Sequence, residues 1–401
     1  MRMSRAVRLP RPSAAATAGL VAGALLLAGC GQAGNESTVT ITGTAPASPS
    51  APPPSPSTSA SAEPSAPSSS TSSEPAAPGG PPEVIEEIAT GLEAPWGLDF
   101  FADGDAIVTE RDTQRVLLVS GDDYTVTELG TLDVAAPQGE AGLLGVAISP
   151  DFAQDRFVYF YASTASDNRV VRATLRGDRL GEPTPIFTGI PNGYIHDGGR
   201  LEFGPDGMLY VSTGETGEPS LAQQRDSLGG KVLRLTPAGK PAPGNPFGTA
   251  VWSWGHRNVQ GLAFDDADRL WASEFGQDTF DELNRIDEGA NYGWPQVEGK
   301  GGQDQGFVDP QQVWNTDEAS PSGLAFLDGY LWMAALKGER LWRVRVQGNR
   351  AVEAEPFFVG DYGRMRTVAA TDDGMLWVMT SNRDTRGDPG PGDDKILLVR
   401  P

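Results

Sequence analysis

The chain of 401 residues contains only two histidines, and both lie in short runs typical of a functional site. His196 opens the run His-Asp-Gly-Gly-Arg, and His256 lies in Trp-Gly-His-Arg-Asn. Histidine is the usual proton acceptor in proteins because its side chain titrates close to neutral pH. Each could instead be a hydrogen-bonded core or turn residue, and this structural role is favoured more for His256 than for His196.

An acidic residue follows His196 at a spacing that suits a catalytic pair. We expect His196 to begin the inner strand of a blade and Glu215, in the run Thr213-Gly214-Glu215, to end the next strand of the same hairpin. A tight hairpin brings the open ends of its two strands together. We therefore expect Glu215 to orient the imidazole of His196 and to raise its basicity. The alternative is a solvated carboxylate at a strand end.

The strands that must position these residues form a repeat. Each copy has a short alternating apolar run, a turn that is often Asp-Gly, and a second apolar run. Alternation with a period of two indicates strands, and an Asp-Gly turn between them indicates a hairpin. Six copies cover residues 96–109, 144–161, 199–212, 261–272, 323–333 and 366–378.

Six such units predict an all-β fold, a six-bladed β-propeller, over residues 83–401. We expect the ring to close by pairing of 84–89 with 395–399, so that both ends of the domain share one blade. A pair of β-sandwiches is the alternative, but sandwiches do not repeat one hairpin signature six times. Since propellers bind ligands where loops converge at the central channel, the functional residues are expected in the connections.

The first 82 residues differ from the rest. Residues 1–29 join an arginine-rich start to a short run of apolar and small residues, which is typical of a secretory signal peptide. The run ends Leu-Ala-Gly-Cys at Cys30, the only cysteine. This ending resembles the lipobox of bacterial lipoproteins and predicts a lipid on Cys30. Residues 30–82 are rich in Ser, Pro, Ala and Thr, and predict a disordered linker.

These segments predict an extracytoplasmic protein that is lipid-anchored to the bacterial cell membrane. The formal net charge of −22 argues against a nucleic-acid partner, which requires clustered lysine and arginine. The same acidity is compatible with calcium binding and with a neutral substrate.

Several motifs, in order, resemble the soluble PQQ-dependent glucose/sorbosone dehydrogenase family, which includes the aldose sugar dehydrogenases. The resemblance covers nearly all of 90–400, and family members are six-bladed propellers. The implied function is PQQ- and calcium-dependent oxidation of an aldose sugar or related hydroxy compound, by hydride transfer to the quinone. Electrons would then pass to an unidentified acceptor. The matching motifs are 142–145 with 149–152, 196–215, 230–235, 255–263, 274–282 and 291–295.

The resemblance implies roles for four residues at the reaction centre. His196 matches the base that takes the proton of the sugar hydroxyl. Glu215 matches the acidic residue that holds this base. Arg257 and Asn258 match residues that contact the quinone oxygens, where a cation would stabilise developing charge.

Three further cations match residues that bind PQQ. Lys337 matches a cofactor-contacting lysine, and Arg364 and Arg366 match arginines that bind PQQ carboxylates. The chemistry is suitable, because PQQ is a tricarboxylate and guanidinium groups pair with carboxylates. Ordinary surface charge is the alternative explanation for this set.

The resemblance also implies calcium ligands. Gly276 and Gln277 match positions whose backbone carbonyls hold the calcium that binds the cofactor. Glu282 and the carbonyl of Tyr292 match a second calcium site found in part of the family. Calcium prefers such oxygen ligands.

The part of the family pattern that faces the sugar is altered. Glu140 stands where the family often has a glutamine, so it can accept but not donate a hydrogen bond to the substrate. Ser220 stands where the glucose enzyme has another glutamine, and the substrate-facing aromatics have no clear counterpart in 315–321. Glucose specificity therefore does not carry over.

Two other functions remain open at this point. A non-catalytic ligand-binding propeller lipoprotein would explain the altered sugar positions. A calcium-dependent lactone hydrolase would use the same fold, but such sites draw side-chain carboxylates to the channel metal, and no convincing set is present at the blade starts.

Overall fold

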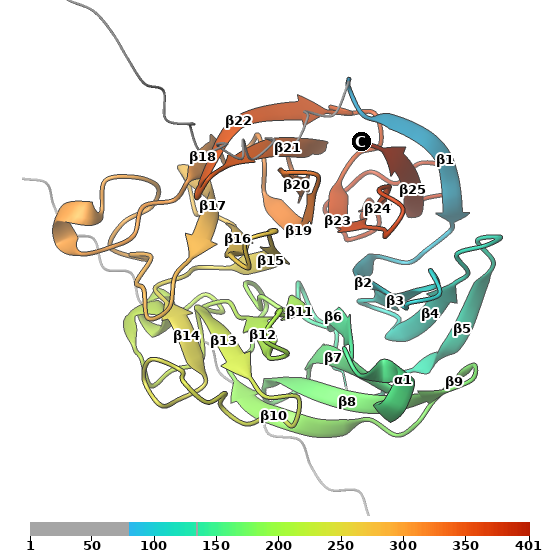
Figure 1. The fold of residues 1–401 in the computed structure, drawn as a ribbon, viewed down its shortest axis with the longest axis horizontal. Coiled ribbons are helices and arrows are strands. Elements are labelled where there is room, and N and C mark those ends of the chain that lie inside the picture. Colours follow the sequence, from blue (N-terminus) through green and yellow to red (C-terminus); the bar gives the residue numbers. More distant parts are fainter. Residues whose placement is uncertain (1–79, 134) are drawn as a thin grey trace, which may run out of the picture. The chain divides into compact units, whose positions relative to one another are not determined.

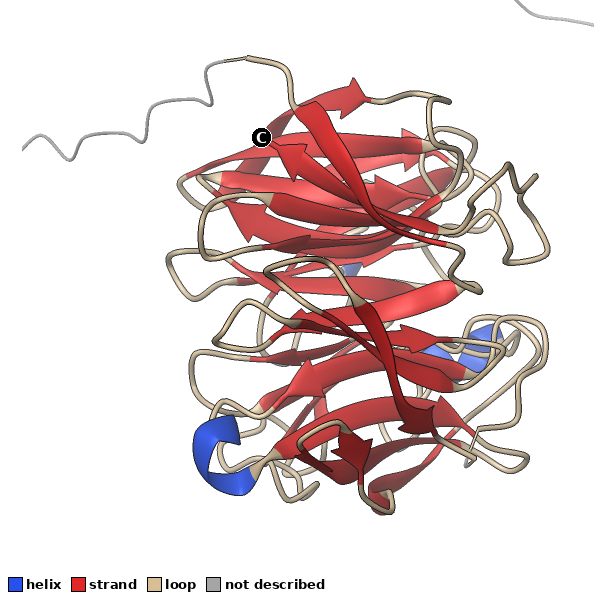
Figure 2. Ribbon diagram, turned by 90° about the vertical axis from the view of Figure 1, so that its right-hand side faces the viewer, coloured by secondary structure: helices blue, strands red, loops and turns tan. Residues whose placement is uncertain are grey.

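The computed structural model describes residues 80–133 and 135–401. The signal peptide expected over 1–29, Cys30 and nearly all of the linker expected over 30–82 lie outside these residues. In the described part, six antiparallel sheets surround a central axis as the blades of a β-propeller (Figure 1), which confirms the predicted fold. Seen from the side, the strands run between two faces on which the loops gather (Figure 2).

Each blade has four main strands. In the first five blades the strand numbers rise from the axis outward, and in the sixth blade the outermost strand is β1. The first blade contains β2 (Pro95–Phe100), β3 (Ala106–Glu110), β4 (Arg115–Val119) and β5 (Val126–Thr131). The second contains β6 (Leu143–Ile148), β7 (Phe157–Ser163), β8 (Asn168–Arg176), the short β9 (Arg179–Leu180) and β10 (Thr184–Ile190). The third contains β11 (Leu201–Phe203), β12 (Leu209–Ser212), β13 (Lys231–Leu235) and β14 (Val251–Trp254).

The remaining three blades follow the same plan. The fourth contains β15 (Val259–Phe264), β16 (Leu270–Glu274), β17 (Phe280–Ile286) and β18 (Gln312–Asn315). The fifth contains β19 (Pro321–Leu327), β20 (Tyr330–Ala335), β21 (Arg340–Gln347) and β22 (Arg350–Phe357). The sixth contains β23 (Met365–Ala370), β24 (Leu376–Thr380), β25 (Lys395–Arg400) and β1 (Glu83–Thr90).

Helical structure is limited to three short elements. They are α1 (Phe152–Asp155), η1 (Pro219–Gln223) and η2 (Gln303–Gln305). Among the described residues, no helix is long and apolar enough to cross a bilayer.

The ring closes as the sequence predicts. β1 is the outermost strand of the sixth blade and pairs antiparallel with β25, so that Glu83 lies opposite Arg400 and Thr90 opposite Lys395. The first and last strands of the domain therefore complete one sheet, in which β25 is paired on both sides.

The core lies between the blades. Its buried apolar residues form six clusters; five join two neighbouring blades, and the sixth joins the second and third blades and also includes Trp96 of the first. Trp271 and Trp332, both fully buried, come from the second strands of the fourth and fifth blades. The alternation recognised in the sequence is thus the alternation between the two faces of a blade, both of which are covered.

The glycines that open the repeats allow neighbouring inner strands to meet near the axis. A Cβ on Gly97 would lie 2.8 Å from the carbonyl oxygen of Leu144 in the next blade, and one on Gly323 would lie 2.6 Å from Cα of Thr367. Hydroxyl groups bond across the same junctions. Thr109 Oγ1 donates to the carbonyl of Leu144 at 2.5 Å.

Because Gly323 faces backbone rather than a movable side chain, Gly323→Ala is expected to destabilise the protein by about 1–3 kcal/mol. Gly181→Ala is the matched control, since a Cβ there would lie 3.4 Å from its nearest neighbour. Urea unfolding of both variants measures the difference. Equal midpoints for Gly323→Ala and the parent would contradict this account of the blade junction.

Candidate active site

The predicted site residues gather on one face of the propeller. Each inner strand begins, and each second strand ends, on this face, as the pairing of Pro95 with Glu110 and of Met365 with Thr380 shows. The loops that lead into inner strands and out of second strands therefore converge around the same mouth of the central channel.

His196 and Glu215 form a close pair. Nδ1 of His196 lies 2.5 Å from Oε1 of Glu215, whose side chain is 1% exposed, whereas His196 is 13% exposed. Glu215 is fixed in turn by its backbone N–H, which donates to the carbonyl of Arg257 in the next blade. Among the described residues, Nε2 of His196 has no hydrogen-bond partner. The imidazole is thus held on one side and open on the other.

The backbone around this pair is irregular where the sequence suggested a strand. His196 was expected to begin the inner strand, but β11 begins only at Leu201. The reason is local: His196, Gly198 and Gly199 have φ values of 59°, 66° and 108°, which an extended strand does not allow. Gly214 lies against the carbonyl of His196, where a Cβ would collide with it. A side chain at position 214 would therefore push Glu215 away from the histidine.

Arg257 and Asn258 lie beside the pair, in the connection from β14 to β15. Oδ1 of Asn258 accepts the N–H of Gly198 at 3.0 Å, which ties the histidine loop to the next blade. Arg257 donates to the carbonyl of Phe275 at 3.3 Å, and its Nε is buried with no partner among the described residues. Burial lowers the pKa of this guanidinium. An unpartnered buried N–H of this kind is suited to a ligand.

A cavity of about 260 Å³ is lined by two direct partners of these residues, Phe275, which accepts from Arg257, and Glu140, which accepts the backbone N–H of His196. His196, Glu215, Arg257 and Asn258 do not themselves line it. Lys337, Arg364 and Arg366, predicted together, all line it, and so does Glu140. Lys337 follows the second strand of the fifth blade, Arg364 directly precedes β23, and Arg366 is the second residue of β23. The structure thus brings this part of the predicted site into one place.

Sequence reasoning missed other residues that line this cavity. Trp96, Phe275 and Leu336 supply apolar walls, and Arg111, Asp384 and Arg386 supply charge. Arg111 follows β3, and the other two lie in the connection 381–394 between β24 and β25. A stricter repeat alignment would have found Arg111 at a strand end on the site face. Nothing in the composition of 381–394 indicates that Asp384 and Arg386 belong to the site.

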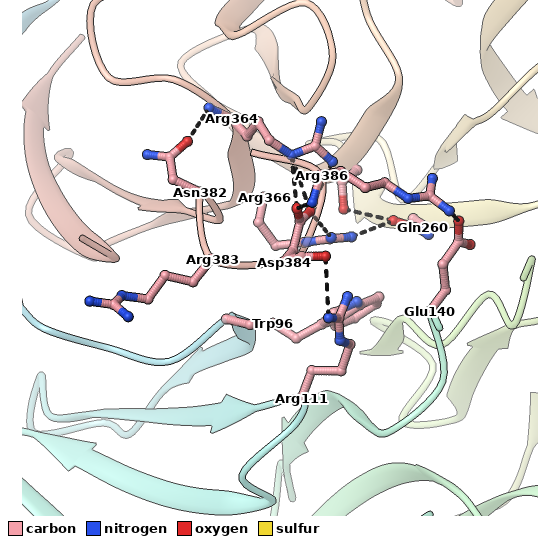
Figure 3. A network of polar contacts seen from close by, with 12 residues as sticks. Trp96, Arg111, Glu140, Gln260, Arg364, Arg366, Asn382, Arg383, Asp384 and Arg386 are labelled. Carbon is pink, nitrogen blue, oxygen red and sulfur yellow. Dashed lines mark hydrogen bonds and ion pairs between the residues drawn. The ribbon is translucent and has the colours of Figure 1, made fainter. Parts of the chain in front are cut away.

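Asp384 holds the two arginines (Figure 3). Its Oδ2 lies 2.8 Å from Nη2 of Arg364 and 3.1 Å from Nη2 of Arg366. Burial acts to raise the pKa of Asp384, but the two guanidinium groups outweigh it and the pKa lies below its usual value. Burial, reinforced by neighbouring arginines, lowers the pKa of Arg366 to about 10. One carboxylate therefore does not satisfy the local positive charge, and Nε of Arg366 remains buried without a partner in the described part.

The expected calcium ligands lie in the fourth blade and its long connection. The N–H groups of Gly276 and Gln277 donate to Asp281 and Glu298, at 2.8 and 2.7 Å. Within residues 80–133 and 135–401, no group of three or more His, Cys, Asp or Glu side chains could hold a metal.

Glu282, expected at the second calcium site, is 8% exposed. It accepts hydrogen bonds from Gly299 and Asn284, and burial together with the charge of Glu274 raises its pKa to about 8. Tyr292 is buried and stacks on His256 with ring centroids 4.6 Å apart. A carboxylate this strongly desolvated is stabilised by a nearby cation.

His256 has the structural role that was favoured for it. It is fully buried, with Nδ1 2.8 Å from Glu274 and Nε2 2.8 Å from Ser253. Both ring nitrogens are occupied, so the ring has no free atom for a substrate. Ser220 is also remote from the cavity; its hydroxyl donates to Glu218.

Comparison with known proteins identifies the family. The model of the glucose/sorbosone dehydrogenase family matches residues 92–396. The chain belongs to this family. The predicted family, and with it the enzyme class of a sugar dehydrogenase, are confirmed.

The glucose/sorbosone dehydrogenase relatives share the sequence and the fold. The aldose sugar dehydrogenase YliI of Escherichia coli is 31% identical over 333 residues, which cover 74% of this chain and 89% of that protein. Quinoprotein glucose dehydrogenase B of Acinetobacter calcoaceticus is 33% identical over 250 residues, 53% of this chain and 52% of its own. The structure of the PQQ-bound form of aldose sugar dehydrogenase from Streptomyces coelicolor superposes with a TM-score of 0.78 at 54% identity, covering 80% of this chain and 97% of that one.

Proposed function

We propose that this glucose/sorbosone dehydrogenase binds PQQ in the cation-lined cavity and oxidises an aldose or a related hydroxy compound. The main support for this proposal is the net charge of the side chains that line the cavity. Five cationic side chains and two carboxylates line it, which leaves an excess of three positive charges in a chain whose net charge is −22. PQQ carries three carboxylates, so it matches this excess.

The other features of the cavity also fit PQQ. Trp96, Phe275 and Leu336 offer apolar surface to a flat ring system, and the buried Nε of Arg366 is a donor without an acceptor. Lys337, Arg364 and Arg366 would hold the carboxylates through charge-assisted hydrogen bonds. The PQQ-bound relative from Streptomyces coelicolor, at 54% identity, supports the same ligand here.

His196 is the base of the proposed reaction. Nε2 receives the proton of the substrate hydroxyl, while Nδ1 stays bonded to Glu215. The carboxylate of Glu215 stabilises the imidazolium that results and fixes the tautomer of the free base. When bound, PQQ supplies the acceptor for the hydride that leaves the sugar carbon. Arg257 and Asn258 would face the quinone oxygens, and the positive charge of Arg257 suits the negative charge that develops there.

Calcium is part of the same proposal. The carbonyl groups of Gly276 and Gln277 would hold the ion that contacts PQQ. Glu282, with the carbonyl of Tyr292, would form a second site, where calcium would offset the cost of burying two neighbouring carboxylates.

A non-catalytic ligand-binding lipoprotein remains the second candidate function. The observation that favours it is the altered sugar side, where Ser220 lies outside the cavity and Glu140 is engaged in an ion pair. Turnover by the purified protein distinguishes the two functions.

If His196 is the base, His196→Gln should keep PQQ bound and lower turnover by on the order of a hundredfold or more. Glu215→Gln should produce a smaller loss and a shifted pH profile, because the imidazolium loses its charged partner. Rate–pH profiles of the parent and both variants on the best aldose provide the measurement. Near-parental turnover by His196→Gln would remove this mechanism.

Arg366→Ala should weaken PQQ binding by about tenfold or more, as expected for the loss of a charge-assisted hydrogen bond. Chelation of calcium should weaken binding to the parent as well. Titration of the apoprotein with PQQ measures both effects, with the exposed Arg350→Ala as control. Unchanged affinity after alanine substitution of Lys337, Arg364 and Arg366 would favour the cofactor-free binding protein.

We further propose that the protein is exported and lipid-anchored through Cys30, because this residue ends an apolar export signal. Electrons would then pass to an acceptor at or near the membrane. Cys30→Ala should move the protein from the membrane fraction to the soluble fraction on cell fractionation. A variant that stays membrane-bound after a high-salt wash would contradict the proposed lipid anchor at Cys30.

A further inference from the structure

Arg386 lines the proposed PQQ cavity but is not one of the three cations proposed to hold the PQQ carboxylates. It belongs to the connection 381–394, and its side chain is 54% exposed. Its backbone N–H donates to Oδ1 of Asp384 at 3.0 Å, so its position is fixed by the carboxylate that holds the two cofactor arginines. Its Nη2 lies 2.7 Å from Oε1 of Glu140 on the opposite side of the mouth (Figure 3).

Glu140 connects this arginine to the base. Its Oε2 accepts the backbone N–H of His196 at 3.0 Å, and its own N–H donates to the carbonyl of Tyr194 at 3.0 Å. The Glu140–Arg386 ion pair is therefore bonded to the histidine segment at one end and to the cofactor arginines, through Asp384, at the other. Both members of the pair line the cavity, so a substrate in the cavity beside the histidine segment can contact them.

The pair has unused hydrogen-bonding capacity on the cavity side. A guanidinium has five N–H donors. In the described part of the chain, only the Nη2 group of Arg386 has a side-chain partner, the carboxylate of Glu140. Glu140 is 19% exposed, so its oxygens can also accept a bond from outside the protein. Donors in fork geometry beside an acceptor match two neighbouring hydroxyl groups of a sugar.

We propose that Arg386, held by Glu140, is a substrate-recognition residue that binds two neighbouring hydroxyl groups of a neutral aldose. The inference rests on the proposed function and adds the residue that replaces the altered sugar-binding positions. A neutral sugar is favoured over a sugar acid, because the charge of Arg386 is already balanced by Glu140. A substrate carboxylate at this place would also lie beside the carboxylate of Glu140.

The test compares Arg386→Ala and Arg386→Lys with the parent on one neutral aldose, its monodeoxy analogues and the corresponding uronic acid. Arg386→Ala should lower kcat/KM for the full aldose by roughly tenfold or more, mainly through KM, because charge-assisted hydrogen bonds to the substrate are lost. Arg386→Lys should recover part of this. On the deoxy sugar that lacks a contacted hydroxyl, the parent and the alanine variant should have similar kcat/KM values.

Arg383→Ala is the matched control. Arg383 lies in the same connection, but its side chain points away from the cavity, donating to the carbonyl of Asp393 and pairing with Glu93 (Figure 3). This variant should show the parental pattern across the deoxy sugars. The urea midpoint of Arg386→Ala should equal that of the parent, and at saturating PQQ its loss of kcat/KM should depend on which hydroxyl groups the sugar carries. A merely structural role would not produce this dependence.

Two outcomes overturn the inference. If Arg386→Ala lowers kcat/KM equally for every deoxy sugar, Arg386 contacts no hydroxyl group. If the parent prefers the uronic acid and Arg386→Ala abolishes this preference, Arg386 binds a carboxylate. A parent that binds no PQQ, or that binds it and oxidises no aldose, would overturn the proposed function itself and is recognised before any variant is compared.

Discussion

The close contact between inner strands at the propeller axis is the constraint on which the rest of the structure depends. Where Gly97 and Gly323 meet the backbone of the next blade, a single methyl group would not fit. Hydroxyl groups join neighbouring blades at other junctions: Ser273 donates to the carbonyl of Ser322, between the fourth and fifth blades, and Thr367 to that of Trp96, between the sixth and first blades. These contacts set the width of the channel. They therefore also set the distances among the loops that carry the site.

Charge within the site is balanced in a different way from charge in the rest of the chain. The protein is strongly acidic, yet Arg364 and Arg366 share one carboxylate, that of Asp384, and Arg111 donates to the backbone carbonyl of the same residue. Burying several like charges is costly unless they are paired and hydrogen-bonded. Asp384 meets part of this need and keeps the guanidinium groups in fixed orientations, while the remaining positive charge is available to an anionic ligand. The positive charge that Asp384 leaves unbalanced on these arginines therefore favours an anionic ligand.

Much of the fold could be predicted from the sequence because its signals are local. The alternation of each hairpin and the turn within it depend on neighbouring residues only, and the closure of β1 on β25 follows from counting strands. The pairing of His196 with Glu215 could be predicted for the same reason, since one hairpin joins them. The positions of Asp384 and Arg386 could not. They lie in an irregular connection with no periodicity, and what brings them to Glu140 is the closing of the ring, a contact between residues more than 200 positions apart.

The register of β1 on β25 also fixes the face of the propeller at which the polypeptide enters the domain. β25 starts at Lys395, directly after the connection that borders the cavity, and ends at Arg400 on the opposite face. Glu83 pairs with Arg400, so the polypeptide enters the propeller on the face away from the cavity. The point where residues before Glu83 join the domain and the mouth of the cavity therefore lie on opposite faces of the propeller, and a ligand can reach the cavity from a face that does not carry this attachment point.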